Sequence, residues 1–378
     1  MAAPGSTTFC ARRWDRCRSA MPVIAFMLLW SQGAAQIRRA PAECYDTTCV
    51  RDLSLTPTLR AYLVHKFNGL NVGSQRHGPI ELRPNRNINM GLGISYRRIT
   101  LNVAFPIPFV NDDDDARGDS RTLDAQANVF GVLRVTNLFL QVSRGQHMPD
   151  FSPAALGWSQ PTERAYRADL REFNLGLSTM RVVDPEHFSY RAAFNQDAWQ
   201  KRSASTWLFG GYATVYTLRA DSAIVPWRLR DPAVLGERFS SAALVDAGLM
   251  GGRAHTWVHR QHWFFSASVA LGAGCSYRAL ADAEGERVQH GPDLGVGLRA
   301  QWRASLGHAG PRHFIGVLAS QETAWHGLDR AQRIAFHVGN VRLVYAYHLR
   351  ERRRELDRGL HWLRKRTPMG DELVPEVK

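Results

Sequence analysis

Apolar and polar residues alternate along most of this chain, and that alternation limits its fold more than any other feature of the sequence. Thirteen runs follow the period-two pattern: 58–72, 87–96, 101–105, 123–133, 137–143, 173–182, 188–195, 207–218, 242–258, 263–277, 294–304, 314–323 and 334–347. Such alternation indicates β-strands with one polar and one apolar face. The chain is therefore predicted to be all-β.

The connections between these runs are of two kinds. Short ones lie at 97–98, 134–135, 184–186 and 260–261, and long polar ones lie at 74–86, 110–121, 147–170 and 280–292. Short turns at one end and long loops at the other are typical of outer-membrane β-barrels.

The two faces of the strands support the same interpretation. Aromatic residues lie near the run ends, where membrane interfaces place them: Tyr96, Phe105, Trp207, Trp257, Trp263, Trp302, Trp325, Tyr345 and Tyr347. Several runs approach the ~9–11 residues of a spanning strand, and a closed barrel leaves no backbone group unpaired in lipid. The predicted fold is a transmembrane antiparallel up-and-down β-barrel.

The number of strands should be even, because both chain ends are expected in the periplasm. Thirteen runs leave one crossing unaccounted for, and the polarity of the turns places it between residues 222 and 240. We expect a weak strand there and fourteen strands in total, with twelve as the alternative.

The first 35 residues resemble a signal peptide. Four arginines precede an apolar run at 21–30, and Gly33-Ala34-Ala35 offers a cleavage site. The translation start is either Met1 or Met21. The predicted organisation is a signal peptide (1–35), a periplasmic segment (36–56), an outer-membrane barrel (57–349) and a charged periplasmic tail (350–378).

Cleavage after Ala35 removes four arginines and one aspartate, so the net charge falls by three, from +14 to +11. The remaining basic residues are scattered instead of forming one block, so we do not expect nucleic acid as a partner. Outer-membrane lipids or lipopolysaccharide fit better. In the tail, Leu349, Leu356, Leu360 and Leu363 favour a short helix that could contact a periplasmic partner. The oligomeric state stays open.

Three cysteines remain after cleavage. Cys44 and Cys49 close a short loop that an oxidising periplasm could bridge, and two free thiols are the alternative. No further ligands suggest zinc, and no metal or cofactor is expected.

Enzymatic chemistry has weak support. His187 and Ser189 have the spacing that places both on one face of a strand, but they adjoin a short turn and so lie at the periplasmic rim. The acidic run at 112–115 could attract calcium, but it lacks the spaced ligand order of a defined calcium loop, so we favour a solvated loop tip. A barrel enzyme that hydrolyses lipid or peptide is kept as the alternative function.

Charged residues on the polar face are the candidates for a functional lumen. They are Asp124, Arg191, Arg299 and Arg303. An inward cluster of this kind suits an anion-favouring, porin-like pore or a transporter of small amphiphiles. A structural barrel whose charges only neutralise one another is the alternative.

Several motifs resemble the family called domain of unknown function 4421. They include the stretch Phe188-Ser189-Tyr190-Arg191-Ala192-Ala193-Phe194-Asn195-Gln196, with Gln200, Lys201, Gly210, Gly211 and Asp221 after it. The resemblance covers about residues 58–347 and implies a barrel in a Gram-negative outer membrane with no established activity. The Cys44–Cys49 pair and the charged tail depart from the family pattern.

Overall fold

The computed structural model describes residues 45–86, 88–96, 99–107, 110, 114–288, 294–326 and 333–349. The predicted signal peptide, Cys44 and the charged tail lie outside these residues. No helix within the described ranges is long and apolar enough to cross a membrane.

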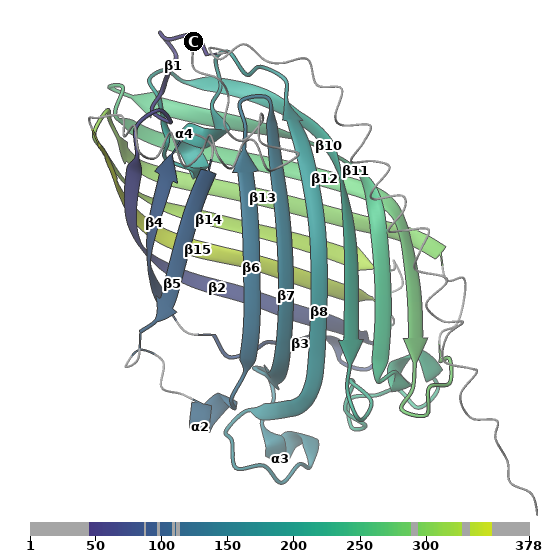
Figure 1. Cartoon of the computed structure of the whole chain (residues 1–378). Coiled ribbons are helices and arrows are strands. Elements are labelled where there is room, and N and C mark those ends of the chain that lie inside the picture. Colours follow the sequence, from purple (N-terminus) through teal and green to yellow (C-terminus); the bar gives the residue numbers. More distant parts are fainter. Residues whose placement is uncertain are drawn as a thin grey trace, which may run out of the picture. The chain divides into compact units, whose positions relative to one another are not determined.

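A thirteen-stranded antiparallel sheet forms most of this region and curves into a barrel wall (Figure 1). One strand, β3 (Gly78–Leu82), pairs with β2 off the main path. The others run in the order β5-β4-β2-β15-β14-β13-β12-β11-β10-β8-β7-β6. Their bounds are β2 Thr58–Ser74, β4 Ile88–Tyr96, β5 Ile99–Pro106, β6 Arg121–Phe130, β7 Arg134–Met148, β8 Ala165–Val182, β10 Ala204–Arg219, β11 Ser241–His259, β12 Trp263–Ala281, β13 Leu294–Ala309, β14 His313–His326 and β15 Ile334–His348.

The all-β prediction is confirmed, and side-chain burial follows the alternation. In β11, Leu244 and Asp246 are buried, whereas Leu249 on the opposite face is 70% exposed. Apolar residues therefore cover the outside of the wall, and polar residues are frequent inside it.

The expected fourteenth strand is absent, since residues 222–240 contain only a short 3-10 helix, η1 (Leu235–Arg238), among the described residues. The predicted strand at 188–195 is also wrong. Residues Tyr190–Phe194 form helix α4. Removing one run from thirteen leaves twelve strands on the main path. The number of strands is therefore even, as expected, and matches the alternative of twelve.

Helix α4 resembled a strand because its aromatic residues occupy even-numbered positions. Tyr190 and Phe194 are four residues apart, which also places them on one helix face, and their rings lie 4.8 Å apart. The side chain of Ser189 accepts a hydrogen bond from the Ala192 amide and caps the helix. Local capping and aromatic contact therefore outweigh the alternation.

The two ends of the wall carry different connections. At the short-turn end, turns of a few residues join β4 to β5, β6 to β7, β11 to β12 and β13 to β14. The other end, the long-loop end, carries the long connections, including α2 (Asp114–Arg117) and α3 (Pro153–Leu156). The one exception is the β8–β10 connection, which is long although it lies at the short-turn end.

An apolar cluster fills the barrel at the long-loop end. It combines the ends of seven wall strands with β3, α3 and the β10–β11 loop, and its fully buried members include Leu70, Leu82, Leu156, Leu218 and Ile224. We call this group the long-loop cluster. It closes that end of the interior with side chains.

Candidate functional site: the cap and the basic chamber

The exceptional β8–β10 connection folds back over the short-turn end. Within it, β9 (Ala198–Gln200) pairs with β1 (Val50–Asp52) of the N-terminal segment. We call residues 45–57 and 183–203 together the cap. Its two parts are far apart in sequence, so the cap forms only when these two segments meet in the folded chain.

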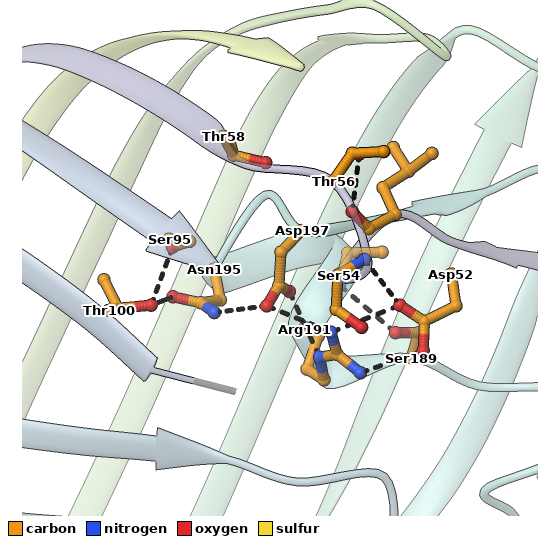
Figure 2. Close-up of polar contacts among 12 residues, drawn as sticks. Asp52, Ser54, Thr56, Thr58, Ser95, Thr100, Ser189, Arg191, Asn195 and Asp197 are labelled. Atoms are coloured by element: carbon orange, nitrogen blue, oxygen red, sulfur yellow. Dashed lines mark hydrogen bonds and ion pairs between the residues drawn. The ribbon is translucent and has the colours of Figure 1, made fainter. Parts of the chain in front are cut away.

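Arg191 and Asp197 are both buried charges of the cap, each with 1% of its surface exposed. The guanidinium of Arg191 makes a bidentate contact with Asp197, through Nε at 3.1 Å and Nη2 at 3.0 Å. On the other side it reaches Asp52, at 3.2 and 3.3 Å. Figure 2 shows Arg191 between the two carboxylates. All three guanidinium nitrogens are thus used, as the planar fork of arginine allows.

The protonation of these groups reflects the pairing. Burial alone would raise the pKa of Asp52, but the charge of Arg191 and hydrogen bonds from Ser54 outweigh it and lower that pKa. Burial opposes the charge on Arg191 as well, yet Asp197 and Asp52 raise its pKa. The pairing therefore favours the charged forms of Asp52 and Arg191, whereas burial raises the pKa of Asp197.

Gln200 and Asn195 connect this centre to its surroundings. Gln200 donates to the His187 carbonyl at 2.7 Å and accepts from the Ser189 amide at 2.9 Å, which holds the start of α4. Asn195 donates to Asp197 at 2.9 Å and accepts from Thr100 on β5 at 3.2 Å (Figure 2). The cap thus contacts the wall at β5.

The aromatic face of α4 points into the barrel. Tyr190 donates to Ser268 on β12 at 2.8 Å and stacks on Phe130 of β6. Phe188 and Phe194 pack with inward residues of the neighbouring strands. The cap therefore closes the short-turn end of the interior with an apolar underside and an ionic centre.

A polar chamber of about 100 Å³ lies beneath Phe194. Its lining comes from β6, β7, β13, β14 and β15 and includes Gln126, Asn128, Asn137, Gln301, Arg303, Glu322, Asn340 and Arg342. Phe194 of the cap and these five strands line the chamber.

The predicted lumen residues occupy distinct positions around this chamber. Arg303 donates to Asn137 at 2.7 Å and lies over the Phe130 and Tyr190 rings. Arg299 pairs with Glu322 at 2.8 Å. Asp124 faces Arg86 at 2.9 Å and Lys66 at 3.5 Å. Arg191, predicted on the same wall, belongs to the cap instead, because its segment is a helix.

Several guanidinium nitrogens around the interior have no protein partner. Among the buried side-chain atoms of the described residues, these include Nε of Arg303, Nε of Arg342, and Nε and Nη2 of Arg86. A buried cationic donor without an acceptor is costly, so a polar acceptor is expected to complete this region. Arg303 is only 9% exposed.

The remaining predicted residues lie elsewhere. The Lys201 backbone amide donates to the Cys49 carbonyl at 2.7 Å, within the cap. Gly210 and Gly211 lie on β10, and a Cβ at Gly210 would collide with the Thr179 carbonyl of β8. The Asp221 amide donates to Asp169 at the long-loop end. Cys49 is buried in the cap, and its bridge to Cys44 stays a prediction.

The candidate hydrolase pair is occupied by structural contacts. His187 bonds to Asp184 at 2.9 Å, and Ser189 caps α4 while its hydroxyl donates to Tyr45 at 3.0 Å. The acidic run contributes Asp114 and Asp115 to the exposed first turn of α2. No group of three or more metal-ligating side chains occurs among the residues with assigned positions.

Three important residues were missed from the sequence: Asp52, Asp197 and Arg342. Arg342 alternates with Val341 and Leu343 on β15, so its inward direction could have been read from the pattern. Asp52 gave no signal, because it lies 139 residues from Arg191. Only the folded chain brings these two together.

The fold and the capped interior define a β-barrel wall with a polar interior. The chain belongs to the family described as a domain of unknown function (DUF4421), which matches residues 45–349. No curated protein matches.

Solved structures of bacterial membrane proteins show similarity at low identity. The outer membrane protease OmpT from Escherichia coli is 7% identical, with a TM-score of 0.28, over 78% of this chain and 97% of that one. The Pseudomonas putida toluene transporter TodX is 8% identical, with a TM-score of 0.27, over 78% and 91%. The translocator domain of the Neisseria meningitidis autotransporter NalP is 8% identical, with a TM-score of 0.31, over 90% and 99%.

Proposed function

We propose that this protein is an outer-membrane transport barrel of a Gram-negative bacterium that binds small anionic amphiphiles in its basic chamber. The membrane location is supported by the outside of the wall, where Leu92, Leu249 and Leu271 are 65%, 70% and 64% exposed. Leucines exposed to this extent on three wall strands suit lipid. Trp207, Trp257 and Trp263 lie exposed near the short-turn end, as an interfacial girdle would.

The orientation follows from the loops. In barrels of this class the short turns face the periplasm and the long loops face outward. The cap would then lie on the periplasmic side and the long-loop cluster at the cell surface.

The single observation that carries the ligand class is the set of buried guanidinium nitrogens without partners. Arg303 and Arg342 both line the chamber, and their unused donors favour an anionic headgroup. Phe130 and Phe139 line the same space, which suits an attached apolar group. The ligand is therefore an amphiphile with a carboxylate or phosphate head.

Both ends of the interior are filled by side chains, and this favours a binding transporter over an open pore. The cap occupies one end and the long-loop cluster the other. Reconstituted protein in a planar bilayer is accordingly expected to conduct little. A steady, large conductance would contradict this part of the proposal.

Binding to the purified protein tests the ligand class. Dodecanoate and dodecyl phosphate are titrated into the protein in a neutral detergent by calorimetry. Arg303→Gln and Arg342→Gln should each weaken binding about tenfold to hundredfold, since a hydrogen bond to a charged group contributes ~1.5–3 kcal/mol.

Arg253→Gln is the matched control, because Arg253 is exposed on the outside of β11 and lies over Trp207. It should bind both probes like the natural protein. Equal binding by all three variants would remove the chamber from the proposal, and no binding by the natural protein would reject the ligand class.

A further inference from the structure

The barrel wall is discontinuous at one place. Within the described residues, β5 pairs only with β4 and β6 pairs only with β7, whereas each other main-path strand pairs on both sides. Figure 1 shows β5 and β6 separated along the front of the sheet. We call the facing edges of residues 99–106 and 121–130 the β5–β6 seam.

Side chains at the seam are exposed on both faces of the wall. Asn102 and Ala104 of β5 share the inward face with Arg60 and Tyr62 of β2, through Gly93 and Gly91 of β4. Nevertheless both are exposed. The inward residues Ser266, Ser268 and Ala270 of β12, by contrast, are 1–4% exposed. The interior is therefore accessible beside β5 and sealed beside β12.

The chamber adjoins the seam. Gln126 and Asn128 of β6 line the chamber, and Asn128 is exposed. A group held at Arg303 therefore needs to cross only the β6 edge to leave the barrel through the wall.

The outer margin of the seam is apolar on both strands. Leu101 and Phe105 of β5 are 63% and 61% exposed, and Leu123 of β6 is 60% exposed. A molecule that passes between the strands thus meets polar groups inside and apolar groups outside. That sequence of surfaces matches the two ends of an amphiphile.

The seam is limited at both ends. At the long-loop end, Arg83 after β3 bridges to His147 of β7, which joins the two sides of the wall. At the short-turn end, Thr100 of β5 contacts Asn195 of the cap. The discontinuity is therefore a bounded gap in strand pairing, and the cap contacts one of its edges.

We propose that the β5–β6 seam is a lateral portal through which an anionic amphiphile passes between the basic chamber and the membrane. This inference rests on the proposed ligand class. Unpaired strand edges are costly in lipid, and β5 and β6 present such edges to the seam. The axial route is closed at both ends, and the seam connects the chamber to the surroundings without moving either closure.

The test closes the seam covalently. Asn102→Cys/Asn128→Cys is prepared in a protein whose natural cysteines are replaced by serine, and it is joined with a short bifunctional thiol reagent. The matched control is Ala273→Cys/Leu298→Cys, a directly opposed pair on the hydrogen-bonded strands β12 and β13. Both proteins are reconstituted in phosphatidylcholine vesicles.

Uptake of alkyl carboxylate and alkyl phosphate probes with a terminal diazirine is followed by photolabelling and peptide mapping. Without the reagent, the tail should label residues 99–106 and 121–130 more than the outer face of β12. Joining the seam should abolish labelling inside the chamber, and joining β12 to β13 should not change it. The two probes distinguish a fatty-acid-like ligand from a phosphate-bearing one.

The outcomes separate the two proposals. Chamber labelling that persists in the joined seam would overturn the portal and leave the anion site intact. Uniform labelling of the whole outer surface, with probe still bound inside, would also overturn it. Failure of both probes to bind the unjoined protein would overturn the ligand class, and the portal with it.

Discussion

The two ends of the barrel interior are closed by different kinds of interaction. The cap at the short-turn end is organised by the ion pairs of the buried Arg191, whereas the long-loop cluster is almost entirely apolar. An ionic centre is sensitive to the loss of one partner, because the other charge is left buried. An apolar cluster loses stability in proportion to the volume removed. The cap is thus the closure that a single substitution disrupts most.

The largest effect is expected for Arg191→Met. It leaves Asp197, which is 1% exposed, without its bidentate partner, and should lower the free energy of unfolding by about 3–5 kcal/mol. Urea unfolding in detergent micelles measures this. Arg202→Met, an exposed change in the same connection, is the control. Similar stability of the two variants would contradict an ionic cap.

Truncation in the long-loop cluster should come next. Leu82 is fully buried, so Leu82→Ala should cost about 2–5 kcal/mol through lost burial and the remaining cavity. Leu235→Ala, on η1 and 43% exposed, provides the comparison and should change stability little. If Leu82→Ala proved as mild as Leu235→Ala, the interior would not be sealed by packing at that end.

The helix caps at the two ends allow a smaller test. Ser189→Ala removes the side chain that caps the N-terminus of helix α4, together with its hydrogen bond to Tyr45. This substitution should lower the free energy of unfolding by about 1–2 kcal/mol. Ser152→Ala removes the cap of α3, whose hydrogen bond is longer at 3.3 Å and exposed. Ser152→Ala should therefore lower the free energy of unfolding by only about 0.5 kcal/mol, the lower end of the range for loss of a helix N-cap. A larger loss of stability in Ser152→Ala than in Ser189→Ala would argue against helix α4 as the organising element of the cap.

The smallest effect concerns pH. A hydrogen bond from His187 to Asp184 raises the pKa of the imidazole above its ordinary value of 6.5. The contribution of this pair is therefore complete below pH 6.5 and is lost as the pH rises through the raised value. His187→Gln should remove that change from a pH series of unfolding midpoints. If the pH dependence of the unfolding midpoint were unchanged in His187→Gln, it would arise from another titrating group.

The strands of this protein could be read from its sequence. Twelve of the thirteen alternating runs are wall strands, because burial on one side of a sheet repeats every two residues. The even number also followed from the expectation that both chain ends lie in the periplasm, although the strand expected between residues 222 and 240 is absent. What failed was the run 188–195, where aromatic residues at even positions fit a short helix equally well.

The cap and the seam could not be read in that way. The contact of Arg191 with Asp52 joins residues 139 positions apart, and no local pattern reports such a pairing. The absence of strand pairing between β5 and β6 also leaves no mark in the sequence, because both strands alternate like their neighbours. Periodicity is a local property, so the sequence alone determined which residues face inward and which face outward. Whether adjacent edges join, and what fills the interior, depends on distant groups meeting in space, and only the tertiary structure decided that.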